Sequence, residues 1–210
     1  MEEKNQQPLD DLKDIKEMME RSSRFISLSG LSGIAAGICA LVGLYLVVLK
    51  IDCWKIDDCL FPLLRNEGRE LEKQLYLIAA GTFAAAFISA FFFTWIRSKK
   101  NKVPVWGPVA RRLMWNEVVP LVAGAFFLYA MIRLKQYELV APGCLVFYGL
   151  ALVNASKYTL SEIRYLGYLE ILLGLINCWY TGYGLQFLAV GFGMLHIIYG
   201  AIMWWKYERK

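Results

Sequence analysis

The amino-acid sequence predicts an all-α fold, a polytopic membrane bundle of six transmembrane helices preceded by an amphipathic helix. Three observations lead to this fold class. Hydrophobic residues make up 58% of the 210 residues and the mean hydropathy is +0.42, whereas soluble domains are about 45–50% apolar. Six apolar runs approach the roughly 20 residues that cross a hydrocarbon core. Lys and Arg also concentrate in alternate flanks of these runs, as they do beside the cytoplasmic ends of transmembrane helices.

The first predicted element is an amphipathic helix over residues 8–24, within a cytoplasmic segment 1–24. Pro8 suits a first-turn position, and Asp10 and Asp11 suit the positive end of the helix dipole. An apolar stripe follows, made by Leu9, Leu12, Ile15 and Met19. The helix either leads into the first span, with this stripe packed on the bundle, or presents the stripe to a protein partner.

The six apolar runs form a predicted transmembrane domain over residues 25–205. The expected spans are residues 25–49, 74–96, 113–132, 139–156, 165–180 and 185–205. The fourth and fifth runs are short and need neighbouring polar residues to reach full length. Residues 206–210 follow as a predicted cytoplasmic tail.

The distribution of basic residues predicts the orientation in the membrane. The N-terminal segment, the loop after the second run, the fourth loop and the C-terminal tail carry 16 of the 23 Lys and Arg residues. The other side carries seven, so both termini are expected in the cytoplasm. This arrangement accounts for the net charge of +5. The lipid bilayer is therefore the expected partner, and the charge requires no nucleic acid.

Two of the five cysteines lie in the predicted outer loop. An oxidising outer compartment would let Cys53 and Cys59 form a disulfide, and two unpaired thiols are the alternative. The other three, Cys39, Cys144 and Cys178, fall in the spans and are expected to pack as small residues.

A short similarity recurs along the chain. The segments LIAAGTF, LVAPGCL and FLAVGFG each carry glycine in fifth place, at Gly81, Gly143 and Gly191. The recurrence favours three helical hairpins derived from one ancestral unit.

Polar residues within the spans are the candidate site. Glu170 shares a face of the fifth run with Gly167 and Gly174, and His196, the single histidine, shares a face of the sixth run with Gly193 and Gly200. Small and polar residues at helical spacing face other helices rather than lipid. A short turn joins these two runs, so we expect Glu170 and His196 to meet.

Three further polar residues, Glu117, Asn154 and Ser32, are expected with Glu170 and His196 in the half of the bundle nearest the cytoplasm. Ionisable side chains inside a membrane indicate function by default. Together with Glu170 and His196 they form a candidate ligand or proton site. Hydrogen bonding that only joins helices is the alternative interpretation.

Catalysis is less well supported. Ser32 and His196 resemble the serine–histidine dyad of rhomboid-type intramembrane proteases, but here the serine lies on the first span and the site would open inward. The sequence has no HExxH, Walker A or CxxC motif. We therefore predict no catalytic residue, no metal site and no cofactor.

Three stretches carry a resemblance to a family. These are MERSSRFISLSGLSGIAAG (19–37), NASKYTLSEIRYLGYLEILLG (154–174) and GFGMLHIIYGAIMWWKYE (191–208). They resemble a family of small, uncharacterised bacterial membrane proteins with six spans. The resemblance implies a helical bundle in the bacterial inner membrane and no particular activity.

The sequence does not specify a biochemical activity, and three functions remain open. The first, which the sequence favours, is a non-catalytic protein that binds a partner or senses conditions through residues 8–24. The second is a small-molecule or proton-coupled transporter that uses the candidate polar site. The third and most remote is an intramembrane serine hydrolase using Ser32 and His196.

Overall fold

The computed structural model describes residues 28–52, 69–101 and 105–209, and these residues form helices and short connections without a β-strand. The predicted helix over residues 8–24 and the cysteine pair Cys53 and Cys59 lie outside the described residues. The α-helices of the described part are α2 (Gly30–Ile51), α4 (Arg69–Asn101), α5 (Pro108–Arg133), α6 (Val140–Ala155), α7 (Glu162–Asn177), the short α8 (Gly184–Leu188) and α9 (His196–Tyr207). Three 3-10 turns and one π-helical segment join them, namely η2 (Tyr137–Leu139), η3 (Ser156–Tyr158), η4 (Thr181–Tyr183) and the π-helix η5 (Ala189–Leu195).

Five helical stretches are long and apolar enough to cross a membrane. They are Gly30–Ile51, Glu70–Asn101, Pro108–Arg133, Tyr137–Tyr158 and Thr181–Tyr207. The protein is therefore an all-helical protein suited to a lipid bilayer. The fifth predicted span corresponds to α7, which has 16 residues. At about 1.5 Å per residue it is roughly 24 Å long, shorter than a hydrocarbon core of about 30 Å.

Helix boundaries follow local chemistry. Helix α4 begins five residues before the predicted second span, with Glu70 and Glu72 in its first turn and two lysines in its last. These charges complement the helix dipole. Helix α5 begins at Pro108 and continues through Pro120. Although proline favours a break, the irregular backbone lies instead in the last span, at η5.

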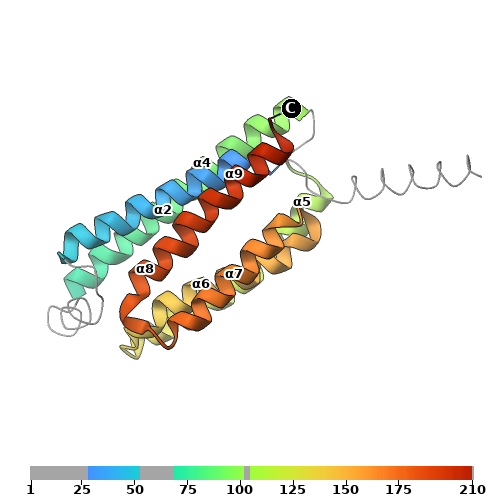
Figure 1. The fold of residues 1–210 in the computed structure, drawn as a ribbon. Coiled ribbons are helices and arrows are strands. Elements are labelled where there is room, and N and C mark those ends of the chain that lie inside the picture. The colour runs from blue at the N-terminus through green and yellow to red at the C-terminus, as the bar shows by residue number, and fades with distance from the viewer. Residues whose placement is uncertain (1–27, 53–68, 102–104, 210) are drawn as a thin grey trace, which may run out of the picture.

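The helices form two halves. Helix α2 packs against α4 and α9, whereas α6 packs against α5 and α7. We call α2, α4, α8, η5 and α9 the α2 half, and α5, α6, α7 with their 3-10 turns the α5 half. The two halves run side by side in Figure 1 and meet where α8, η5 and α9 contact α6 and α7.

Glycine allows close packing inside each half. In the α2 half, a Cβ atom on Gly200 would lie 2.6 Å from the Gly30 carbonyl oxygen, and one on Gly37 would lie 2.7 Å from the Gly193 carbonyl oxygen. In the α5 half, a Cβ on Gly149 would lie 2.7 Å from the Gly167 carbonyl oxygen. Such contacts bring helix backbones together where no hydrophobic force drives association.

The bundle has two distinct ends. One end holds the start of α2, the end of α4, the start of α5 and the end of α9, and Figure 1 shows the C-terminus there. We call it the basic end, because Arg97, Arg111, Arg112 and Lys206 are among its residues. The other end holds the end of α2, the start of α4 and the turns η2 and η4, and we call it the opposite end.

Candidate functional site

The candidate site is built around a buried carboxylate on α7. The Glu170 side chain is 0% exposed, and no described residue donates a hydrogen bond to either of its oxygens. It packs against the last span at Gly191, where a Cβ atom would lie 2.5 Å from Glu170 Oε2. Glycine at position 191 therefore leaves the space that the carboxylate occupies.

His196 approaches this carboxylate from the other half of the bundle. Its Nδ1 atom lies 3.5 Å from Glu170 Oε1, and the imidazole is buried. The same Nδ1 lies 3.0 Å from the Gly191 carbonyl oxygen. A carbonyl only accepts, so Nδ1 carries a proton and donates it to Gly191. The two ionisable groups that the sequence placed near each other are thus in contact.

The other imidazole nitrogen contacts a tyrosine from α6. Tyr148 Oη lies 2.7 Å from His196 Nε2. In the neutral imidazole with a proton on Nδ1, Nε2 accepts and the tyrosine hydroxyl donates. Phe192 lies edge-on to Tyr148, with ring centroids 5.1 Å apart, and it also contacts His196. The imidazole is therefore held in one orientation by two hydrogen bonds and two aromatic rings.

The π-helical segment η5 positions the histidine. It ends at Leu195, directly before His196, and contains Gly191 and Gly193. The carbonyl that accepts the imidazole proton lies five residues before the histidine, the spacing of a π-helical turn. Single π-helical turns inside α-helices are frequent at functional sites.

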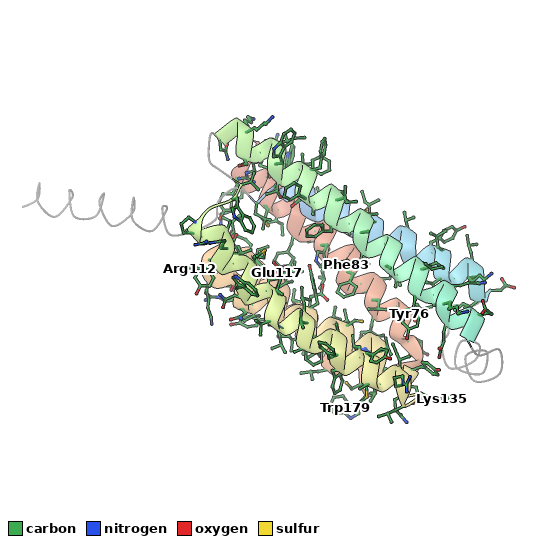
Figure 2. The ribbon with its side chains drawn as sticks, turned by 180° about the vertical axis from the view of Figure 1, so that it is seen from behind. Tyr76, Phe83, Arg112, Glu117, Lys135 and Trp179 are labelled. Atoms are coloured by element: carbon green, nitrogen blue, oxygen red, sulfur yellow. The ribbon has the colours of Figure 1, made fainter. Side chains whose placement is uncertain are left out.

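Glu117 on α5 adds a second carboxylate near the tyrosine. Glu117 and Glu170 both lie within electrostatic range of the Tyr148 hydroxyl. Figure 2 shows Glu117 on the early turns of α5, after Arg112, with α8 and α9 visible between α4 and α5. Groups from α5, α6, α7 and the last span thus gather at one place, which we call the central site: Glu117, Tyr148, Glu170 and His196.

The other two predicted site residues lie elsewhere. Asn154 joins α6 to α5, because its Nδ2 donates to the Asn116 carbonyl at 2.9 Å. Its Oδ1 accepts from Lys157 Nζ at 3.1 Å. Ser32 donates to the Ser29 carbonyl at 2.5 Å, and its hydroxyl is not among the partners of His196. The structure thus gives both residues local bonding roles.

Tyr148 is the site residue that sequence reasoning missed. Tyrosine is common in this chain, with 12 copies, and membrane tyrosines usually mark the interface with water. Tyr148 instead lies halfway along the fourth predicted span, residues 139–156. A tyrosine in the middle of a span cannot lie at the interface with water. That position was the feature of the sequence that could have identified Tyr148 as a site residue.

A second carboxylate, that of the half-buried Glu208, lies at the basic end. Glu208 accepts hydrogen bonds from the Gly30 backbone N–H at 2.5 Å, from Ser29 Oγ at 3.1 Å and from Arg97 at 2.6 Å. Arg97, which is 8% exposed, also donates to the Leu28 carbonyl. Helix α9 thus continues to Tyr207, and Glu208 caps the start of α2.

Three cysteines in the described part of the chain, Cys39, Cys144 and Cys178, are free thiols. Within the same residues, no group of three His, Cys, Asp or Glu side chains could hold a metal ion.

Comparison of the chain with family models, with curated proteins and with solved structures found no match.

Proposed function

We propose that this chain is a proton-coupled membrane transporter whose proton site is formed by Glu170, His196 and Tyr148. The observation that carries the proposal is the buried Glu170 carboxylate, which lacks a hydrogen-bond donor among the described residues and contacts an imidazole from the other half. Structural carboxylates in a membrane bundle are normally paired or hydrogen-bonded. This one is placed to gain or lose a proton.

The chemistry of the site gives one proton two positions, the Glu170 carboxylate and His196 Nε2, because Nδ1 already carries the proton that it donates to Gly191. On Glu170 the proton makes a neutral acid, which is cheaper to bury than an unpaired charge. On the imidazole it makes a cation 3.5 Å from the carboxylate, which is an ion pair. Tyr148 can donate to a neutral imidazole and must accept from a charged one. A change of protonation therefore rearranges the hydrogen bonds between α6 and the last span.

The position of the site between the halves supports coupling to movement. His196 belongs to the α2 half, whereas Tyr148 and Glu170 belong to the α5 half. In many transporters the coupling site lies near mid-membrane between two halves that move against each other, beside an interrupted helix. The π-helical segment Ala189–Leu195 is such an interruption.

The proposed location follows from charge and from resemblance. The basic end would face the cytoplasm by the distribution of Lys and Arg. The resemblance to bacterial proteins with six spans supports an inner-membrane location, with α7 as a short sixth span. Partner binding through residues 8–24 depends on residues outside the described part and stays a prediction.

Proton binding is tested by infrared spectroscopy of the purified protein at acid and alkaline pH. We expect a carboxylic acid band that appears with acid in wild type and is lost in Glu170→Gln. Glu70→Gln is the matched control, because Glu70 is exposed and pairs with the neighbouring Lys73 on its own helix. A wild-type spectrum identical to that of Glu170→Gln at every pH would refute the proton site.

The carried molecule is sought by native mass spectrometry of the same proteins. We expect a bound small molecule in wild type and its loss from folded Glu170→Gln and His196→Gln. An empty wild type, together with strong destabilisation of both variants, would instead assign the pair to structural bonding.

A further inference from the structure

The contacts between the two halves occur at three levels along the bundle. The central site is the middle level. Each end also has a polar contact between the halves, and both of these contacts include a glutamate and a tyrosine. These two outer levels are not part of the proton site.

At the opposite end, Tyr137 of η2 donates a hydrogen bond to Glu72 of α4. Tyr137 also packs on a hydrophobic cluster made by Val48, Ile51, Leu71 and Leu185. The α5 half therefore contributes the tyrosine, and the α2 half contributes the carboxylate and the cluster.

At the basic end the contributions are exchanged. Glu162, the first residue of α7, accepts from Tyr207 Oη at 2.9 Å and from Lys206 Nζ at 2.5 Å, both on α9. Beside this contact lies a second hydrophobic cluster, made by Leu152, Leu160, Ile163, Leu166 and Met203. Here the α5 half contributes the carboxylate and the α2 half contributes the tyrosine.

The central site lies at equal sequence distance from both ends. Tyr148 follows Tyr137 by 11 residues, and His196 precedes Tyr207 by 11 residues. At about 1.5 Å per residue each separation is roughly 16 Å. The two end contacts are then about one hydrocarbon thickness apart, with the proton site halfway between them.

We propose that Glu72–Tyr137 and Glu162–Tyr207–Lys206 are two latches that open in alternation and expose the central site to one side at a time. This inference rests on the proposed transport function and deepens it. Each half is held internally by close glycine contacts, so each moves as a unit. When two such units rock about the central contact, one end separates while the other stays closed. In the structure described here both latches are closed.

The test measures distances between spin labels in the full chain with its native cysteines replaced. The pair at residues 165 and 205 spans the basic end, and the pair at residues 49 and 134 spans the opposite end. Tyr165, Trp205, Leu49 and Leu134 are all exposed, so labels there leave the latches intact. Glu162→Ala, which removes the acceptor of both bonds, is expected to raise the ratio of open to closed molecules at the basic end about tenfold, the effect of losing a hydrogen bond to a charged group.

The opposite latch gives the reciprocal result. Tyr137→Phe is expected to lengthen the distance between residues 49 and 134 and leave the distance between residues 165 and 205 unchanged. Tyr207→Phe, which keeps the Lys206 contact, is a milder second variant for the basic end. Lys157→Gln and Glu70→Gln are controls at the two ends, because their contacts stay within one half.

Variants that open both ends equally, or that move neither distance, would overturn the latch proposal. A normal latch response with no proton band from Glu170 would leave the latches in place and refute only the proton site. The two proposals therefore fail by different measurements.

Discussion

Two glutamates of this bundle, the buried Glu170 and the half-buried Glu208, have opposite surroundings. Glu208 at the basic end accepts hydrogen bonds from a backbone N–H, a serine hydroxyl and a guanidinium. Glu170 at the central site has no donor within the described residues, and only an imidazole at 3.5 Å. The first carboxylate is fully compensated as an anion, and the second is not.

The difference separates a structural charge from a functional one. A buried ion pair whose charges are hydrogen-bonded stabilises the helices that it joins. Removal of one partner leaves the other charge buried without compensation. A buried carboxylate without donors contributes little to folding as an anion, so its presence requires another reason. We expect substitutions at Glu208 to affect stability and substitutions at Glu170 to affect proton binding.

The largest effect is expected at the structural charge. Glu208→Ala leaves Arg97 buried without its carboxylate and the start of α2 without its acceptor, and should cost about 3–5 kcal/mol of stability. Thermal unfolding in detergent measures this loss. The double variant Arg97→Met with Glu208→Leu should recover most of it, because replacing both members of a buried pair is nearly neutral. If Glu208→Ala lowered the stability by less than about 1 kcal/mol, the value expected below for Glu170→Gln, the two carboxylates would not differ in their structural role.

The next effect separates packing from charge in the same region. Gly30→Ala would place a Cβ atom against the backbone of Trp204 and Gly200, and overpacking of this kind costs about 1–3 kcal/mol. Gly81→Ala is the control, since a Cβ there meets nothing within 4 Å. The thermal midpoint should fall for the first variant and stay near wild type for the second. Equal midpoints would show that α2 and α9 tolerate separation at this crossing.

A smaller effect is expected from the tyrosine at the central site. Tyr148→Phe removes the hydrogen bond to His196 Nε2 and should cost about 1 kcal/mol in thermal unfolding. Tyr165→Phe, at an exposed tyrosine, should cost nothing measurable. The acid-induced infrared band of Glu170 should also shift in Tyr148→Phe, because the imidazole beside it loses a partner. An unchanged band would exclude Tyr148 from the proton site.

The smallest stability effect is expected at Glu170 itself. Glu170→Gln keeps the volume of the side chain and removes a charge that lacks hydrogen-bond donors, so the change should stay below about 1 kcal/mol. Thermal unfolding of this variant beside Glu208→Gln sharpens the comparison, because the same chemical change should be much more costly at position 208. A large loss at position 170 would make Glu170 a structural residue.

Much of the helical architecture could be predicted from the sequence. Apolar length predicts four of the long helices and the interrupted last one, and the spacing of Glu170 between two glycines predicts its burial against other helices. The proximity of Glu170 and His196 was also predictable, since a short turn joins their spans. These features depend on contacts within a helix or between neighbouring helices, which local pattern encodes.

Other features could not be predicted in this way. Pro120 indicates a break that α5 does not have, whereas η5 carries no proline and is irregular. The hydrogen-bond partners of Tyr148 and Glu208 could not be predicted from neighbouring residues. His196 lies 48 residues from Tyr148, and Gly30 lies 178 residues from Glu208.

The order of residues alone predicts that this protein is helical and apolar enough for a membrane, and which faces of its last two long apolar segments carry polar residues. Which polar groups meet depends on the packing of the helices. Helix periodicity orients a side chain but does not choose its neighbour. The choice depends on how far two helices slide and rotate before their backbones touch, and here glycine contacts between distant helices set that register.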